Sequence, residues 1–478
     1  MQPQINFISP EEQEYIHKSA LRLMENVGMQ MPAREAVDIM KGAGAKIEGE
    51  NIVKIPEELA TDAVAKAPKR DDFVLYGREE KHDIHFNRDA PVLTSMEEAT
   101  HVLDLETKER RPCTNKDLAD IVRLIDALDN IRINANLATP QDIPKHTCEW
   151  YTLATVLKNT SKHLTVDAPG AQFVRDAVKM ASLSVGGEEN LRKRPFITFV
   201  VLTRPPFQID RLSLEALIEM SRQGFPIKLS SGPILGMTSP VTIAGTLAQV
   251  HAEFLSCLVL SQIVRPGTPV MYTSFARGFD MKTVNVSMAS PEFAIMRGAI
   301  AQMAHYLDLP ARTPGFLRDA KVLDAQAGFE SGTVGLVAAM AADVMDGLQY
   351  DMDTLVDFAD IVFCDEAWGA LKRIARGFSI DENGMALDTI KEVGHGGSFL
   401  GTQHTLKNFR NELWTPHLME RRAWAQWEKD GKKDTEQRAR EKAREILASH
   451  QPQQLSPEVE AEIDRIAQEA TIDYTESI

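Results

Sequence analysis

A strand–helix–strand unit between residues 226 and 280 most constrains what this chain can fold into. The short apolar runs 226–231 and 269–275 flank a longer segment, about 241–264, whose apolar residues recur at helical spacing. This order predicts two parallel strands joined by a right-handed crossover helix. Both runs are too apolar for a sheet with one wet face, so we expect strands that are covered on both sides.

The same alternation of strand and helix repeats from residue 91 onward. Strands are expected at 91–94, 131–138, 163–167, 196–202, 226–231, 269–275, 309–315 and 345–349. About eight strand–helix pairs, spaced by roughly 30 to 45 residues, predict a closed (β/α)8 TIM barrel. An open doubly wound sheet usually carries a Gly-rich first turn, and neither G-x-G-x-x-G after a strand nor a Walker loop occurs, so nucleotide binding is not expected.

Segments of a different character flank the predicted barrel. Residues 1–90 are expected to form an N-terminal α/β cap, in which Ser9, Pro10 and Glu12 predict a capped first helix and 72–86 a β-hairpin. The barrel is expected over residues 91–393.

Residues 394–478 are expected to form a Gly-rich loop and a C-terminal helical tail, with helices at about 418–429, 435–449 and 457–470. Trp414, Trp424 and Trp427 lie in this tail. Large aromatic residues on a polar tail indicate docking on the same or another protomer, so a homo-oligomer is expected.

Composition excludes several classes of partner. The net charge of −16 argues against nucleic acid and anionic membrane surfaces. No run of about 18 apolar residues suggests a membrane span, and the first residues lack the pattern of a secretory signal. The four cysteines are far apart in the sequence, which favours reduced cytoplasmic thiols over a metal site.

The chemistry of a TIM barrel lies at the carboxyl ends of its strands. Here these ends are rich in hydroxyls, aromatic residues and arginines, and poor in general acids and bases. A cation could bind on aromatic faces, and an arginine could bind a carboxylate through two hydrogen bonds. The alternative is that these side chains only fill the top of the barrel. The candidate substrate-binding residues are Phe207, Phe275, Arg277, Arg312, Phe316, Gln349, Tyr350 and His395.

Two of these candidates carry specific expectations. Arg312, at the exit of the seventh predicted strand, is expected to anchor a substrate carboxylate, although strand alternation leaves its direction open. His395 lies in a Gly-rich loop whose backbone could approach a ligand, or which could be a structural turn. His82 and His85 are expected to be surface residues of the hairpin rather than metal ligands.

Several motifs in order resemble the trimethylamine methyltransferase family over nearly the whole chain. They are the segments 324–330, 394–400 leading to His404, and 414–416, together with the charged tail. The resemblance implies a TIM barrel that transfers a methyl group from an amine to the Co(I) corrinoid of a separate protein. It also implies that no cofactor is bound tightly and that no metal site is present.

Trimethylamine enzymes of this family carry pyrrolysine near the final barrel strand, whereas residues 343–349 are ordinary here. The chain therefore resembles the branch that lacks pyrrolysine and demethylates quaternary amines such as glycine betaine. The catalytic residues stay undefined, because the nucleophile would arrive on the corrinoid partner. Two alternatives remain: a non-catalytic barrel that binds a small zwitterion, and a metal-dependent lyase or hydrolase.

Overall fold

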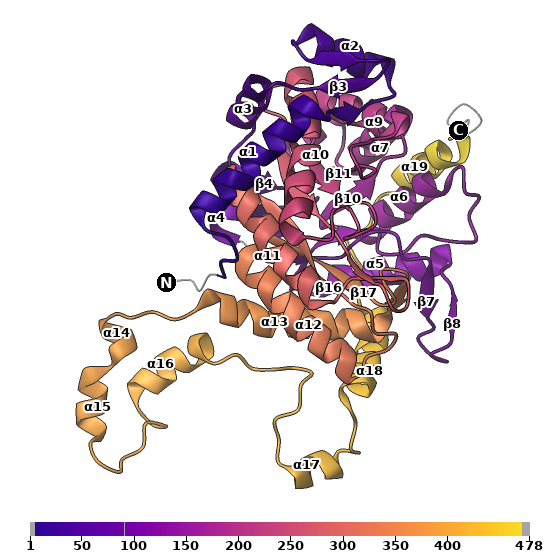
Figure 1. Cartoon of the computed structure of the whole chain (residues 1–478). Helices are drawn as coiled ribbons and strands as arrows, with labels where there is room; N and C mark the ends of the chain where they lie inside the picture. Colours follow the sequence, from indigo (N-terminus) through magenta and orange to yellow (C-terminus); the bar gives the residue numbers. More distant parts are fainter. Residues whose placement is uncertain (1–4, 90, 471–478) are drawn as a thin grey trace.

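The computed structural model describes residues 5–89 and 91–470. Eight parallel strands close into a barrel at the centre of the molecule, which confirms the predicted fold (Figure 1). The predicted strand ranges agree with the observed ones to within about three residues. In chain order the strands are β6 (Val92–Thr94), β9 (Ile131–Ala135), β10 (His163–Asp167), β11 (Ile197–Leu202), β12 (Ile227–Ser231), β13 (Val270–Ser274), β16 (Ala311–Leu317) and β17 (Val344–Gln349).

Helices surround the barrel and bury their apolar faces against its outer side. They are α5 (Asn115–Ala127), α6 (Cys148–Asn159), α7 (Ala171–Ser184), α8 (Glu188–Lys193), α9 (Arg211–Gln223), α10 (Ile243–Val264), α11 (Pro291–Tyr306), α12 (Ala325–Ala341) and α13 (Phe358–Arg376). Helix α10 is long and apolar enough to cross a membrane by composition, which the sequence pattern did not suggest. It is nevertheless a core helix, because 83% of its apolar window is buried inside the protein.

The N-terminal cap packs on the outside of the barrel helices. Its helices α1 (Pro10–Asn26), α2 (Arg34–Gly42) and α3 (Glu57–Lys66) accompany a small sheet of β1 (Met29–Gln30), β3 (Ile52–Lys54) and β2 (Lys46–Glu48). Helix α1 begins with the predicted capping box, in which Ser9 and Glu12 satisfy each other's backbone amides. Helices α1 and α3 lie against α10 (Figure 1).

The predicted hairpin closes one end of the barrel. It consists of β4 (Val74–Leu75) and β5 (Ile84–His85), and its apolar side chains pack against Val92, Ile133, Met271 and Val344 at the amino ends of four barrel strands. These hairpin side chains are Phe73, Leu75, Ile84 and Phe86. The amino end of the barrel is therefore filled, and a ligand can enter only at the carboxyl end.

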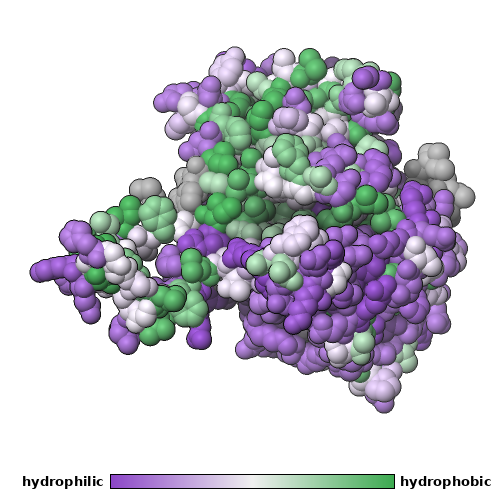
Figure 2. All heavy atoms as spheres, turned by 90° about the horizontal axis from the view of Figure 1, so that it is seen from below, coloured by the Kyte–Doolittle hydropathy of each residue, from purple (hydrophilic) through white to green (hydrophobic). Residues whose placement is uncertain are grey.

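The C-terminal tail has two parts. Helices α18 (Thr435–Ser449) and α19 (Pro457–Glu469) pack on the barrel helices at the predicted positions. Between α13 and α18, the helices α14 (Glu382–Met385), α15 (Leu387–Val393) and α16 (Gln403–Glu412) project from the body (Figures 1 and 2), and α17 (Trp424–Lys429), which follows them in the chain, lies separately below the barrel in Figure 1.

Two helix predictions need correction. The helix expected at 418–429 begins only at Trp424, because the backbone amides of His417, Leu418 and Met419 donate to the buried carboxylate of Glu366 in α13. After the last barrel strand the sequence predicts a helix from Asp353 to about Ile374, but the observed helix begins at Phe358, because β18 (Leu355–Asp357) pairs with β7 (His101–Leu103).

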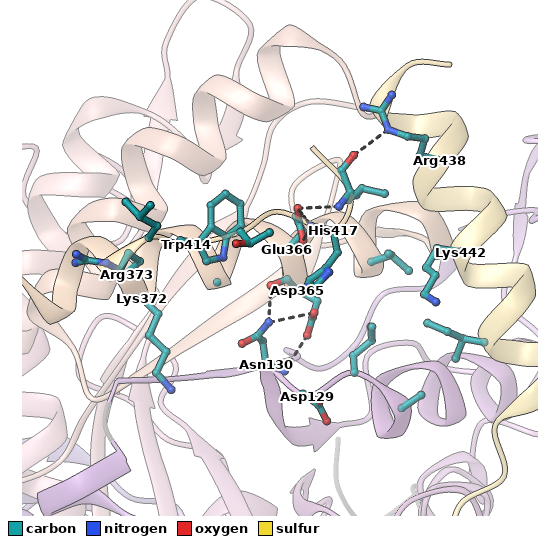
Figure 3. Close-up of a pocket in the computed structure, with 18 of the residues that line it drawn as sticks. Asp129, Asn130, Asp365, Glu366, Lys372, Arg373, Trp414, His417, Arg438 and Lys442 are labelled. Carbon is teal, nitrogen blue, oxygen red and sulfur yellow. Dashed lines mark hydrogen bonds between the residues drawn. The ribbon is translucent and has the colours of Figure 1, made fainter. Parts of the chain in front are cut away.

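A hollow of about 990 Å³ lies where the tail rejoins the barrel, between α13, α18 and the end of α5 (Figure 3). Its two central carboxylates already have partners: Asp365 accepts from Asn130, and Glu366 accepts from the backbone amides named above. The turn containing Asn130 precedes β9, so this hollow lies on the side of the barrel opposite to the carboxyl ends of the strands. We assign it a structural role at the tail junction.

A fully buried ion pair fastens α13 to the end of β16. Both side chains have no exposed surface, and the guanidinium of Arg318 donates to both carboxylate oxygens of Asp360, one contact being 2.8 Å. Tyr350 also donates to Asp360, at 2.7 Å. Breaking such a pair leaves an uncompensated buried charge, which is strongly destabilising.

We therefore expect Asp360→Asn to lower the free energy of unfolding by about 3–5 kcal/mol, measured by chemical denaturation. Asp120→Asn provides the control, because Asp120 pairs with Lys116 and Arg123 on the surface of α5 and exposed pairs contribute about 0–1 kcal/mol. Equal losses in the two variants would contradict the assigned role of Asp360.

Candidate active site at the carboxyl end of the barrel

Four buried charges form one connected group inside the barrel. Lys228 in β12 donates to Glu97 Oε2 at 2.9 Å, and Arg312 in β16 donates from Nε to Asp346 Oδ2 at 2.8 Å. Arg312 Nη2 lies 3.4 Å from Glu97 Oε1, which joins the two pairs. All four side chains are almost completely buried, so two cations and two anions balance one another within the lumen.

Burial and pairing have opposite effects on these groups. Burial alone would raise the pKa of Glu97, but Lys228 and Arg312 lower it below its usual value. Burial would likewise lower the pKa of Arg312, but Glu97 and Asp346 raise it. Both groups are therefore charged at neutral pH.

Above this group the mouth of the barrel gathers four carboxyl groups whose pKa values are all raised, so they ionise most readily when a cation lies beside them. Burial and the neighbouring carboxylates raise the pKa of Asp167, at the end of β10, well above its usual range. Enclosure by the walls of the mouth, together with Glu97 and Asp353, also raises the pKa of the solvent-accessible Glu98. Burial raises the pKa of Glu149 in α6 to about 7 and that of Asp353 to about 6. These four carboxyl groups face few cations, so the mouth favours a positively charged ligand.

Strand alternation explains why Asp167 faces the mouth. Side chains two residues apart point to the same side of a strand. In β10, His163 bonds to Thr198 of the neighbouring strand β11 at 2.8 Å, and Thr165 accepts from Arg312 Nη1 at 3.1 Å. Asp167 continues this inward-facing row at the carboxyl end.

Two strained turns present the other acids. Glu98 has φ of 85°, and Asp351, Met352 and Asp353 have φ of 51°, 57° and 69°, which non-glycine residues rarely adopt. The sheet of β18, β7 and β8 (Arg110–Pro112) lies directly behind both turns and joins them. The carbonyl of Thr354 also accepts from the amides of Thr100 and His101.

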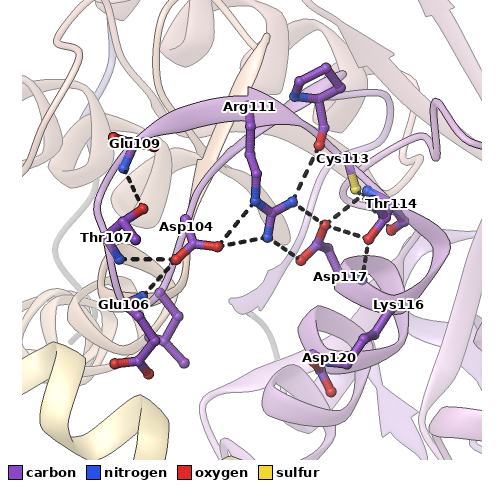
Figure 4. Close-up of polar contacts among 12 residues, drawn as sticks. Asp104, Glu106, Thr107, Glu109, Arg111, Cys113, Thr114, Lys116, Asp117 and Asp120 are labelled. Carbon is purple, nitrogen blue, oxygen red and sulfur yellow. Dashed lines mark hydrogen bonds and ion pairs between the residues drawn. The ribbon is translucent and has the colours of Figure 1, made fainter.

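An arginine clamp fixes that sheet to the barrel. Arg111 in β8 donates to Asp104 in the hairpin and, through Nη1 at 2.6 Å, to Asp117 in the first turn of α5 (Figure 4). Asp117 in turn accepts from Thr114, the N-cap of α5. The strained backbone turns at the mouth are therefore held in place by a hairpin that is itself fixed to the barrel.

One guanidinium faces the acids from the end of β13. Arg277 stacks over Phe275 with its Cζ 4.4 Å from the ring centroid, and its nearest carboxylate oxygen, on Asp353, is 4.0 Å away. The Phe275 ring lies so close to Gly232 that a Cβ there would be 2.6 Å from it. Burial lowers the pKa of Arg277, and Asp353 and Glu98 partly offset this effect.

The segment between Ser274 and Arg277 is held from behind by Arg297 in α11. Its guanidinium donates to the carbonyls of Ser274 and, at 2.7 Å, Ala276. Both the phenyl ring and the guanidinium at the mouth are therefore fixed in position.

Several buried polar atoms around the mouth have no hydrogen-bond partner among the described residues. Such atoms are rare in folded proteins, and where they converge they indicate a place for a polar ligand or water. They include Asp167 Oδ2, Ser230 Oγ, Arg277 Nε, Asp346 Oδ1 and Gln349 Oε1.

Four of the predicted site residues come together at the mouth or directly beneath it: Phe275, Arg277, Arg312 and Gln349. Gln349 donates to the carbonyls of Glu97 and Leu137 at the ends of two neighbouring strands. Arg312 is fully buried, and four of its hydrogen bonds go to protein acceptors. This arrangement favours neutralisation of Glu97 and Asp346 as its role.

Three predicted aromatic residues lie elsewhere. Phe316 packs outward against Gly335 of α12 and Leu371 of α13, and Tyr350 points outward to Asp360. Irregular pairing between β16 and β17, near Pro314 and Gly347, reverses the alternation and turns both rings away from the lumen. Phe207 packs on the cluster of outer helices.

His395 is exposed on the projecting part of the tail, apart from its own barrel mouth. Sequence reasoning also missed important groups. Glu97 and Glu98 follow shortly after the first predicted strand, 91–94, and were not among the candidates. Lys228 was not a candidate either, because it lies near the start of its strand rather than at the carboxyl end.

Within residues 5–89 and 91–470, no group of three or more His, Cys, Asp or Glu side chains is arranged to hold a metal ion. The mouth therefore offers carboxylates, a guanidinium and an amide as its chemical groups. These groups can bind and orient a small molecule that carries both a cation and an anion.

Comparison with known proteins identifies relatives over nearly the full chain. A family model described as "Trimethylamine methyltransferase (MTTB)" matches residues 1–471. The chain is 33% identical over 469 residues to a trimethylamine methyltransferase of Desulfitobacterium hafniense, covering 98% of this chain and 94% of the relative. It is 31% identical over 470 residues to the glycine betaine methyltransferase of Desulfitobacterium hafniense strain Y51, covering 96% of each chain.

One solved structure supports the fold. The crystal structure of the hydroxylamine MtmB complex superposes with a TM-score of 0.52 and 12% identity, covering 92% of this chain and 88% of that chain.

Proposed function

The chain belongs to the trimethylamine methyltransferase family and is a methyltransferase, and we propose that its methyl donor is a quaternary amine bearing a carboxylate. The substrate would be glycine betaine or a related betaine, the product a tertiary amine, and the acceptor the Co(I) corrinoid of a partner protein. The observation that carries this proposal is the mouth, where the carboxyl groups of Glu98 and Asp353 lie near the guanidinium of Arg277 and those of Asp167 and Glu149 lie near Glu98.

A betaine fits this distribution of charge. Its ammonium group would lie against Glu98 and Asp167, and its carboxylate would bind Arg277. Arg277 is suited to this because its Nε is buried without a partner and its nearest acid is 4.0 Å away, beyond a good hydrogen bond. A simple amine would leave the guanidinium unused.

The chemistry suits a site without a dedicated acid. When the N–CH3 bond of a quaternary ammonium breaks, its electron pair stays on nitrogen and the group departs as a neutral tertiary amine. The new bond forms between the methyl carbon and the cobalt of the partner. The protein would hold one N–CH3 bond in line with the acceptor and exclude water.

The described residues of β17 offer no group for covalent activation of an amine. Asp346 is bonded to Arg312, and Gln349 is bonded to two backbone carbonyls. A donor that needs no activation, such as a quaternary ammonium, is therefore favoured.

A corrinoid protein would dock over the mouth. The loops that follow β12 and β13 expose the apolar side chains of Met237, Val241, Met281 and Val284, each at least 63% exposed. Exposed apolar side chains beside a binding site are typical of protein interfaces. The four cysteines are free and buried, which fits the reducing cytoplasm as the place of the reaction.

The decisive experiment mixes the protein with a Co(I) corrinoid protein and candidate amines and follows methyl-Co(III) formation by absorbance. We expect turnover with one or more betaines and none with trimethylamine. Turnover of trimethylamine alone would refute the proposed donor class, and binding of a betaine without transfer to any corrinoid partner would refute the proposed reaction.

Paired variants test which arginine binds the carboxylate. Arg277→Lys should raise the KM for the betaine by roughly ten- to a hundredfold and leave choline nearly unaffected, because lysine lacks the planar fork. Arg312→Lys should impair both substrates alike, because it disturbs the buried charge group rather than a substrate contact. Selective loss of the betaine in Arg312→Lys would assign the anchor to Arg312 instead.

Binding should strengthen with pH. The pKa values of Asp353, about 6, and Glu149, about 7, are raised, as are those of Glu98 and Asp167, so these groups lose negative charge as the pH falls. A cation binds the ionised forms, so the Kd of the betaine should fall by about tenfold or more between pH 5.5 and 8, measured by calorimetry.

3,3-Dimethylbutyrate, in which a carbon atom replaces the quaternary nitrogen, is the control ligand for this measurement. It keeps the shape and the carboxylate but lacks the cation, so its affinity should weaken over the same pH range. A flat response for the betaine, or the same trend for both ligands, would contradict cation binding by the acids.

A further inference from the structure

The part of the tail between α13 and Trp414, residues 377–413, forms a projecting arm (Figure 1). None of its residues is buried. Yet the arm holds ten of the 23 exposed large hydrophobic residues of the described chain, including Ile380 at 77% and Leu400 at 82% exposure. Figure 2 shows apolar side chains gathered on this arm, at the left of the view.

The base of the arm is fixed to the body, so the arm is not a loose tail. Arg373 donates to the carbonyls of Gly377 and Glu412, one on each limb of the arm, at 2.7 and 2.9 Å. Arg376 donates to Asn411. Trp414 then packs so closely on Gly369 of α13 that a Cβ there would lie 3.0 Å from the indole nitrogen.

The two limbs of the arm also bond to each other. His404 Nε2 lies 2.9 Å from the carbonyl of Asn383, and the side chains of Asn383 and Asn408 are 3.2 Å apart. However, α14, α15 and α16 have only four, seven and ten residues. Isolated helices shorter than about 12–15 residues are marginal in water, so the arm needs a partner surface.

The outer face of α12 is an uncharged surface that suits contact with an apolar segment such as the arm. Its exposed residues carry no charge, although the chain as a whole has a net charge of −16. Phe329 is 71% exposed, and the space outside Gly328 and Gly332 is open, so another helix could approach the backbone closely. The exposed residues of this face are Ala325, Gln326, Gly328, Phe329, Gly332 and Thr333.

We propose that the arm of one copy packs on the α12 face of a second copy, and that the exchange is reciprocal. Each chain carries both an apolar arm without a partner and an uncharged helix face without a partner, and a twofold axis satisfies both at once. The fixed base directs the arm away from the body of its own chain, so the arm does not pack on α12 of the same chain (Figure 1).

The size of the arm suits a stable interface. A fully buried large apolar side chain removes roughly 60–120 Å² from water, so ten partly exposed ones supply on the order of 500–800 Å². A stable interface buries about 800 Å² per partner, and reciprocal exchange uses two arms.

Sedimentation velocity of the full chain at micromolar concentration tests the proposal. The wild type should sediment at twice the mass of the chain or more. The arm variant Ile380→Glu/Leu400→Glu and the face variant Gly332→Glu should each become monomeric. Tyr15→Glu, which alters a 71% exposed residue of α1, should leave the assembly unchanged. Far-UV circular dichroism and thermal melting confirm that each variant is folded.

Mixing the two defective variants separates the exchange from other modes of association. A mixed pair keeps one intact contact, between the wild-type arm of the Gly332→Glu copy and the wild-type α12 of the other copy. The equimolar mixture should therefore regain dimers. A monomeric wild type, an assembly that withstands either variant, or a mixture that stays monomeric would overturn the proposal.

Discussion

The buried group of Glu97, Lys228, Arg312 and Asp346 is the interaction on which the rest of this structure depends. Most barrels of this kind fill their interior with branched apolar side chains. Each buried ion costs several kcal/mol in lost hydration, so such a group is stable only when its charges are fully paired. Here it closes the middle of the barrel, while Phe73, Leu75, Ile84 and Phe86 close the amino end. A ligand is thereby confined to the carboxyl end.

Because the lumen charges cancel, the acids above them determine the electrostatics of the mouth. Glu98 and Asp353 occupy strained backbone positions, and the three-stranded sheet behind them keeps the strain from relaxing. Arg111 extends that support to α5. The recognition groups thus stand on a rigid scaffold, which keeps the reorganisation needed on binding small.

The sequence predicted the fold well and the site only in part, for definable reasons. The eight barrel strands could be identified because each is a short apolar run with turn residues on both sides, and because a segment with apolar residues at helical spacing follows each run. Side-chain direction depends on regular alternation, and the irregular pairing of β16 with β17 turned Phe316 and Tyr350 outward. Asp353 and Glu149 reach the mouth through tertiary packing of loops and helices. Local sequence carries no signal for that.

The raised pKa values at the mouth bear on the chemistry as well as on binding. A carboxylate held against a quaternary ammonium stabilises the substrate more than the transition state, since nitrogen loses its charge as the methyl group leaves. A fixed ion pair would therefore slow the proposed reaction. Carboxyl groups whose pKa values lie near neutrality respond differently: they ionise when the cation binds, and they can take up a proton as its charge disappears. Glu149, whose pKa is raised to about 7, and Asp353, whose pKa is raised to about 6, thus allow the mouth to bind a cation without opposing its neutralisation.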